Sequence, residues 1–176
     1  MKKIIFIFTA CLTLGVAKAQ ENSVKVNPLA FFGGSDLVSY ERKLTDNITG
    51  LVGAGYASYS FSSLKYTSFG SELQGRYYIK EALKGFYGGV QAGFSGGKVD
   101  MGVSILNPST NDYVSYTAIR IGGKAGYQWL WKSGFTLDLN LGYAFNKFSY
   151  GDNGGLVSLA GTGTMPNLGF GLGYSF

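Results

Sequence analysis

The chain has 176 residues, 15 basic and 10 acidic, with 28 glycines, 13 tyrosines and 13 phenylalanines, but it has no histidine and only one cysteine. The lack of histidine excludes imidazole metal sites and catalysis by a histidine base, and the lone Cys11 excludes an internal disulfide or a thiolate cluster. Three of the lysines precede residue 20. The remainder is therefore only mildly basic, which argues against a nucleic-acid partner. We predict no metal, no cofactor and no enzymatic activity.

Residues 1–19 have the pattern of a secretory signal peptide. Two lysines precede an apolar run over 4–16, and a small-x-small sequence ends at Ala19. The apolar run is too short to cross a bilayer as a helix. Cleavage after Ala19 leaves residues 20–176 as a single domain. A lipid anchor on Cys11 is an open alternative, although its flanking residues fit that kind of cleavage site poorly.

The remaining chain consists of eight segments in which apolar residues alternate with small or polar ones, separated by turn residues. In chain order the predicted strands are 23–32, 37–44, 48–61, 66–79, 85–95, 115–129, 135–146 and 167–176. Pro28 lies inside the first segment and cannot donate a ladder hydrogen bond, so it weakens that strand or marks a bulge. The facing of the glycine-rich third segment is ambiguous.

The alternation gives each strand one apolar face and one face of small or polar residues. The seventh segment is the clearest case, because Leu137, Leu139 and Leu141 alternate with Asp138 and Asn140. The last segment repeats the pattern, with glycine at most positions of its second face. The predicted fold class is therefore all-β, an eight-stranded antiparallel up-and-down barrel.

Charged residues on the polar face predict an ion-pair network. The inward charges are Glu41, Glu72, Arg76, Arg120, Lys124 and Asp138. Three acidic groups balance three basic groups, and buried charges are tolerated when they are paired, so we expect a closed and neutral network. Lys124 and Asp138 are expected to be neighbours across the sixth and seventh strands. Glu72 and Asp138 could formally form a catalytic carboxylate pair, but the nearby cations favour structural pairing.

The polar face also indicates which side of the barrel meets water. A soluble barrel with an apolar interior would carry many Lys and Glu residues on its outer face, whereas this face is mostly Gly, Ser, Asn and Gln. Aromatic rings gather at both strand ends, as at the two boundaries of a membrane. They are Tyr77, Tyr78, Phe86, Trp129, Trp131, Phe135, Tyr174 and Phe176 at one end, and Phe32, Tyr59, Phe61, Tyr66, Phe94, Tyr116, Phe145 and Phe148 at the other. We therefore predict a transmembrane barrel with its apolar face in lipid.

Connection lengths predict the orientation of this barrel. The connections over 96–114 and 147–166 are long and polar, whereas the turns after the second, fourth and sixth strands are short. Outer-membrane barrels have short periplasmic turns and longer extracellular loops, and an even number of strands leaves both chain ends in the periplasm. Oxygen-bearing residues in the long connections could bind calcium, but plain turn-rich loops explain them better.

The chain resembles the small eight-stranded outer-membrane β-barrel proteins typified by OmpX and the membrane domain of OmpA. The resemblance covers residues 20–176 and includes Gly171, Tyr174 and Phe176, which match the C-terminal assembly signal of that class. Gly169 departs from it, because a polar residue is usual there. The resemblance implies recognition by the barrel-assembly machinery and a location in the outer membrane of a Gram-negative-type cell.

The expected function is a structural or surface-interaction role through the two long loops, with the barrel as a monomeric anchor among outer-membrane lipids. Two alternatives stay open: a narrow channel for small solutes, and a membrane accessory of a secretion or envelope-assembly system. No feature of the sequence identifies a partner for the loops.

Overall fold

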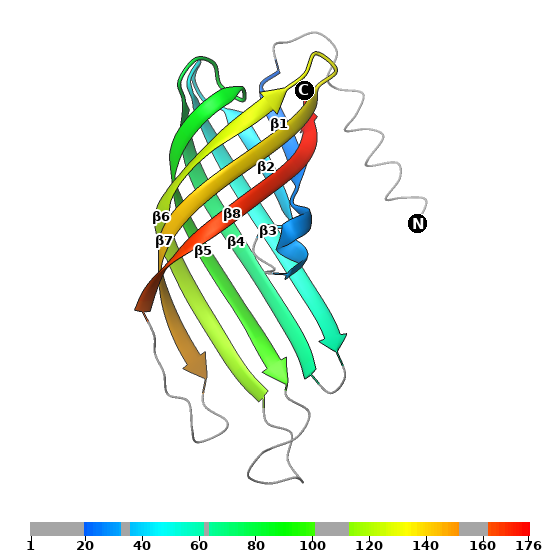
Figure 1. Cartoon of the computed structure of the whole chain (residues 1–176), viewed down its shortest axis with the longest axis vertical. Coiled ribbons are helices and arrows are strands. Elements are labelled where there is room, and N and C mark those ends of the chain that lie inside the picture. Colours follow the sequence, from blue (N-terminus) through cyan, green and yellow to red (C-terminus); the bar gives the residue numbers. More distant parts are fainter. Residues whose placement is uncertain (1–19, 33–35, 62–63, 101–112, 152–161) are drawn as a thin grey trace, which may run out of the picture.

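The protein, described here by a computed structural model over residues 20–32, 36–61, 64–100, 113–151 and 162–176, is a closed β-barrel (Figure 1). Its elements are β1 (Asn22–Val26), the 3-10 helix η1 (Pro28–Phe32), β2 (Val38–Lys43), β3 (Ile48–Phe61), β4 (Leu64–Tyr78), β5 (Gly85–Asp100), β6 (Tyr113–Leu130), β7 (Phe135–Gly151) and β8 (Thr162–Ser175). Each strand pairs antiparallel with the next, and β1 pairs with β8. The predicted eight-stranded up-and-down barrel is confirmed. Within the described residues, no helix has the length and apolar character needed to cross a membrane.

The predicted alternation decides which side chains face the interior. Large apolar side chains on the outer face are well exposed, for example Leu73 at 62%, Val90 at 70% and Leu168 at 74%. Gln91 and Gln128, on the opposite parity of β5 and β6, are 2% and 0% exposed. The barrel therefore has a polar interior and an apolar exterior, the reverse of a soluble protein.

The third strand, whose facing the sequence left ambiguous, follows the same rule. Thr49 and Leu51 are buried in the interior, whereas Val52 and Tyr56 are exposed on the outer face. The register places Leu51 opposite Glu41 of β2, and Glu41 is also buried. Pairing with β2 thus determines which side chains of β3 point inward, because the small residues of β3 give too little contrast between its two faces.

The first predicted strand, 23–32, is wrong in its second half. β1 ends at Val26, and the chain turns into η1 at Pro28. Asn27 holds this turn, because its side-chain oxygen accepts a hydrogen bond from the backbone N–H of Leu29 at 3.1 Å and its carbonyl accepts one from Ala30 at 3.1 Å. Pro28 lacks an N–H and has a fixed φ, so it suits the first turn of a helix better than a strand.

Both long connections are shorter than predicted, because the strands extend into them. β5 continues to Asp100 and β6 begins at Tyr113, while β7 continues to Gly151 and β8 begins at Thr162. These extensions are rich in Gly, Ser, Thr and Lys, so they show little apolar alternation, yet their backbones pair in register. The remaining parts of the two predicted loops, 101–112 and 152–161, lie outside the described residues.

Among the residues that the structure describes, the barrel closes by hydrogen bonding only near the end where β1 begins and β8 ends. β1 pairs with β8 from Ser23↔Ser175 to Val26↔Leu172, and β2 pairs with β3 only as far as Val38↔Ala54. Farther along, β3 and β8 continue without β1 or β2 between them. The short helix η1 lies against both β3 and β8 in this part of the wall, as Figure 1 shows. We call the line between η1 and β8 the seam.

The short turns close the same end of the barrel. Leu83, between β4 and β5, is fully buried, and its carbonyl accepts a hydrogen bond from the Gln128 side chain at 2.8 Å. Its φ of 70° lies in the left-handed region, which is unusual for leucine and directs its side chain inward. In the β2–β3 turn, a 2.9 Å hydrogen bond from Lys43 lowers the pKa of Asp46.

Candidate functional site

Four charged side chains meet inside the barrel near the closed end. Lys25 Nζ lies 2.5 Å from Glu41 Oε2 and 2.9 Å from Asp138 Oδ2. Arg76 Nη1 lies 3.2 Å and 2.7 Å from the same two oxygens. Each cation therefore bridges both carboxylates, and all four side chains are at most 3% exposed. Buried charges persist in such a place because each one is paired more than once.

Neutral donors complete the coordination of the two carboxylates. Glu41 Oε1 accepts hydrogen bonds from the hydroxyls of Thr49 at 2.5 Å and Tyr78 at 2.8 Å. Asp138 Oδ1 accepts one from the hydroxyl of Tyr87 at 2.7 Å, and the Arg76 guanidinium lies 4.4 Å from the centre of the Tyr87 ring. Every carboxylate oxygen of this group is thus engaged, which makes the core rigid.

A second ion group lies beside the first. Glu72 accepts a hydrogen bond from Lys124 Nζ at 2.7 Å, and its other oxygen lies 3.8 Å from Arg120 Nη1. Gln74 links the two groups, because its amide nitrogen donates to Glu72 while its oxygen accepts from Arg76 Nε at 2.8 Å. The interior therefore contains one connected network in place of scattered pairs.

The structure brings all six predicted inward charges into this network, but two details of the prediction are wrong. Lys124 pairs with Glu72 and not with Asp138, because the register sets Lys124 opposite Gly142 and Asp138 opposite Gln128. The expected neutrality also fails, since Lys25 adds a fourth cation that sequence reasoning missed. Its signal was present: Lys25 lies between two outward valines and must face inward by the same alternation.

Glu72 and Asp138, which the sequence offers as a formal carboxylate pair, belong to the two ion groups. Glu72 and Asp138 each accept hydrogen bonds from basic side chains of their own group, so they do not form a carboxylate pair. Both are 2% exposed. The two ion groups connect strands β1, β2, β4, β6 and β7 across the interior.

The outer face has aromatic contacts near the closed end. Phe86 packs edge-on against Tyr127 at 4.6 Å between ring centres, and Tyr127 lies 4.5 Å from Trp129. Trp131 and Phe135 pack at 5.2 Å across the β6–β7 turn.

Several predicted boundary residues share an inward parity. Tyr78 is fully buried in the interior, because it shares the parity of Arg76. Tyr66 and Tyr116 share the parity of the buried Ser68 and Ala118, and their hydroxyls lie 3.0 Å apart.

The residues of the predicted assembly signal lie along the closure. Gly171 faces inward on β8, in contact range of Lys25 and Asp138, and Tyr174 is 46% exposed on the outer face. Phe176 exchanges backbone hydrogen bonds with Asn22, at 2.9 and 2.8 Å. The chain end therefore takes part in closing the barrel.

Comparison with known proteins places the chain among relatives. A family model described as "Protein of unknown function (DUF3575)" matches residues 4–154, a range that contains β1 to β7. The chain belongs to this DUF3575 family. No curated protein and no solved structure matches it. Membership of the DUF3575 family therefore assigns no activity to the chain.

Proposed function

We propose that this chain is an integral outer-membrane β-barrel protein, exported by the leader 1–19, whose barrel anchors two external loops. The observation that supports this most is the inverted polarity of the closed barrel. Its outer face exposes large apolar side chains from every strand, such as Val24, Val52 and Leu141, whereas its buried centre consists of ion pairs. In water the exposed surface would be an aggregation hazard, whereas in a bilayer it is the surface that lipid requires.

The strand pairing also satisfies most of the backbone requirement of a membrane, because β3 to β8 pair in order and β1 pairs with β8 at one end. Hydrocarbon offers no hydrogen-bonding partners, so a spanning sheet must be closed on itself. Strands β3 to β8 have 14 to 18 residues each, more than the roughly 9–11 that a tilted strand needs to cross the hydrocarbon. The additional residues of each strand fit a barrel whose wall projects beyond the membrane on the side of the long loops.

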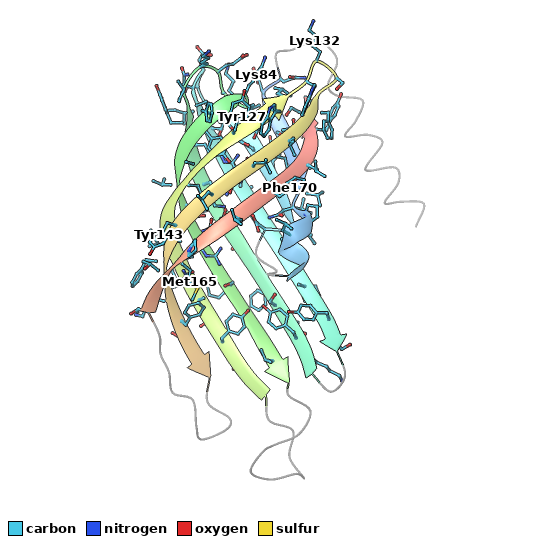
Figure 2. The ribbon with its side chains drawn as sticks, in the orientation of Figure 1. Lys84, Tyr127, Lys132, Tyr143, Met165 and Phe170 are labelled. Carbon is cyan, nitrogen blue, oxygen red and sulfur yellow. The ribbon has the colours of Figure 1, made fainter. Side chains whose placement is uncertain are left out.

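The proposed orientation sets the closed end in the periplasm. Figure 2 shows Lys84 and Lys132 at this end, in the short turns, while Tyr143 and Met165 lie farther along the barrel, near its middle. Aromatic rings such as Trp129 and Trp131 suit the nearby water boundary. The segments 101–112 and 152–161 then face outward and carry the surface-interaction role. We propose that the protein is a monomer without enzymatic activity or cofactor, assembled through Gly171, Tyr174 and Phe176.

The experiment that tests this proposal is fractionation of cells that produce the protein. The mature chain, beginning at residue 20, is expected in the outer-membrane fraction and is expected to stay there after a carbonate wash. Release of the folded protein by carbonate, or recovery from the soluble periplasm, would contradict it. Variants lacking 101–112 or 152–161 should still fractionate with the membrane, because the paired strands β5 to β8 do not include these residues.

The alternative of a narrow channel has less support. Tyr78, Leu83 and Gln128 are fully buried at the closed end, and the charge network lies directly inside them. A conducting pore needs a continuous aqueous path, and tightly paired side chains leave little room for one. The structural anchor is therefore the function that the interior supports best.

A further inference from the structure

Charged residues are almost absent from the outer face of the long strands. From β3 to β8 that face consists over most of its length of Gly, Ala, Ser, Thr, Pro and large apolar or aromatic residues. Among the residues that the structure describes, it has four charged positions, Lys65, Lys98, Asp100 and Lys147. All four lie on β4, β5 and β7 at the end of the barrel opposite the short turns (Figure 1). The charge is therefore confined to one end of the wall and to three of its strands.

Each of the three lysines lies just beyond an exposed phenylalanine on the same face of its own strand. The pairs are Lys65 with Phe69, Lys98 with Phe94 and Lys147 with Phe145. The three phenylalanines are between 43% and 50% exposed, and the rings of Phe69 and Phe94 lie 6.2 Å apart between centres. Aromatic rings suit the edge of the hydrocarbon, and lysine side chains beyond them extend into the head-group layer. The lysines thus lie where lipid head groups are expected.

The register makes Lys65 and Lys98 diagonal neighbours. Thr67 of β4 is the Cα partner of Lys98 on β5, and Lys65 lies two residues farther along the same face of β4. Such diagonal positions are roughly 7–8 Å apart, so two ammonium groups can reach one phosphate between them. Asp100 is the Cα partner of Lys65. Three lysines and one aspartate leave this surface with two excess positive charges.

Hydroxyl groups occupy the strand between the lysines. β6 lies between β5 and β7, and its outward residues at this level are Ser115 and Thr117. Ser115 is the Cα partner of Lys98, and Thr117 is two residues from Ile119, the Cα partner of Lys147. A hydroxyl both donates and accepts hydrogen bonds, so it complements phosphate oxygens. We call the outward surface made by Lys65, Lys98, Ser115, Thr117 and Lys147 the basic patch.

β3 and β8 provide a comparison at the same end of the barrel. Tyr56 of β3 is the Cα partner of Phe69 and is 58% exposed, but the same face beyond it has only Ser58 and Ser60 among the described residues. On β8, which borders the seam, the corresponding residues are Thr162 and Thr164. Lysines that only marked the water boundary would be expected on all of these strands. The one-sided distribution instead favours an anionic ligand bound over β4 to β7.

We propose that the basic patch binds the phosphate group of an anionic lipid, in the leaflet on the side of the long connections. The phosphate oxygens accept hydrogen bonds from the lysines of the patch, and the acyl chains lie over Phe94 and Phe145. Phosphatidylcholine suits the patch less well, because its own trimethylammonium group is repelled by the lysines. This inference rests on the proposed membrane location and adds which lipid one side of the barrel selects.

Photolabelling in phosphatidylcholine vesicles tests the proposal. Two probes carry the same diazirine near the start of one acyl chain, one with the phosphatidic acid head group and one with that of phosphatidylcholine. Labelled residues are mapped by mass spectrometry. At Phe94 and Phe145 the phosphatidic acid probe should label about tenfold more, since each lysine close to an anionic lipid is worth about fivefold. At Tyr56, which has no lysine beyond it, the two probes should label equally.

Salt and matched variants show whether the lysines cause this preference. At about 1 M salt, where the Debye length is about 3 Å, the preference at Phe94 should disappear. A triple variant replaces the lysines of the patch: Lys65→Gln, Lys98→Gln and Lys147→Gln. It should lower the ratio of the two probes at Phe94 to the ratio at Tyr56. The matched control removes three exposed lysines from the turns at the opposite end: Lys80→Gln, Lys84→Gln and Lys132→Gln. It changes the net charge equally and should leave the ratio at Phe94 unchanged.

Two outcomes would overturn the proposal. The first is an equal ratio of the two probes at Phe94 and at Tyr56 in the parent protein, a comparison that needs no variant. The second is an equal loss of preference in the two triple variants. Both can occur in a protein that both probes label on its outer face, and then the membrane proposal stands while this inference falls. Absence of labelling by either probe would instead contradict the proposed function, and the inference with it.

Discussion

Lys25 Nζ lies 2.9 Å from Asp138 Oδ2, although the two residues are 113 positions apart in the chain. Lys25 belongs to β1 and Asp138 to β7, so the ion pair spans β8, the strand between them. Gly171 of β8 faces both side chains at 3.4 Å from the position that its own Cβ would take. The ion pair therefore connects β1 with β7, the two strands that flank β8 in the barrel wall.

Lys25→Met should destabilise the folded barrel by about 3–5 kcal/mol, because Glu41 and Asp138 would remain buried with one cation, Arg76, between them. Urea unfolding in lipid vesicles, followed by tryptophan fluorescence, measures the change. Lys132→Met, in the exposed β6–β7 turn, is the matched control and should have no measurable effect. Equal stabilities of the two variants would show that the closure does not depend on this ion pair.

Gly122→Ala should impair barrel formation, whereas Gly123→Ala at the next position should not. A Cβ at Gly122 would overlap the Tyr143 carbonyl and the backbone of Ala144, neither of which can move without distorting β7. A Cβ at Gly123 meets only the Gly89 carbonyl, at 3.7 Å. Overpacking of this kind costs about 1–3 kcal/mol. The yield of heat-modifiable folded protein after refolding measures both, and equal yields would contradict the register of β6 on β7.

How much of this architecture a sequence can reveal depends on the contrast between the two faces of each strand. Alternation is strong in 135–146, and there the predicted facing is confirmed. It fades in 96–100, where glycine occurs on both faces, and it reverses in 147–151, where Phe148 takes the parity of Asp138 and Lys147 that of Leu137, so these strand extensions were predicted as loop. Pairing partners inside the barrel are harder still. Periodicity gives the face of Lys124 but not the stagger between strands, and the stagger places it beside Glu72.

The purified protein should show no unitary conductance in planar bilayers. Leu83 and Tyr78 are fully buried at the end of the barrel where β1 begins and β8 ends, and the ion pairs of Arg76 and Lys25 occupy the space beyond them. Single-channel recording over a range of voltages checks this, with a protein-free bilayer as control. Reproducible ohmic steps would favour the channel over the anchor.

Leu139→Arg should reduce the stability of the inserted barrel by about 2–4 kcal/mol, because it places a charge on the outer face of β7 that we propose to meet lipid. Leu139→Ile keeps the side chain apolar and of equal size, and it should stay close to the parent protein. Unfolding in lipid vesicles compares the two. An arginine variant as stable as the isoleucine variant would mean that position 139 meets water.

The most direct test of the central claim measures what surrounds the outer face. A nitroxide spin label replaces Leu141, which is 57% exposed, in protein reconstituted into vesicles. The relaxation rate of the label is measured in the presence of dissolved oxygen and, separately, in the presence of a water-soluble nickel chelate. Oxygen concentrates in hydrocarbon, so a lipid-facing label should respond strongly to oxygen and weakly to nickel. A label that responds mainly to nickel would place this face in water and contradict the membrane barrel.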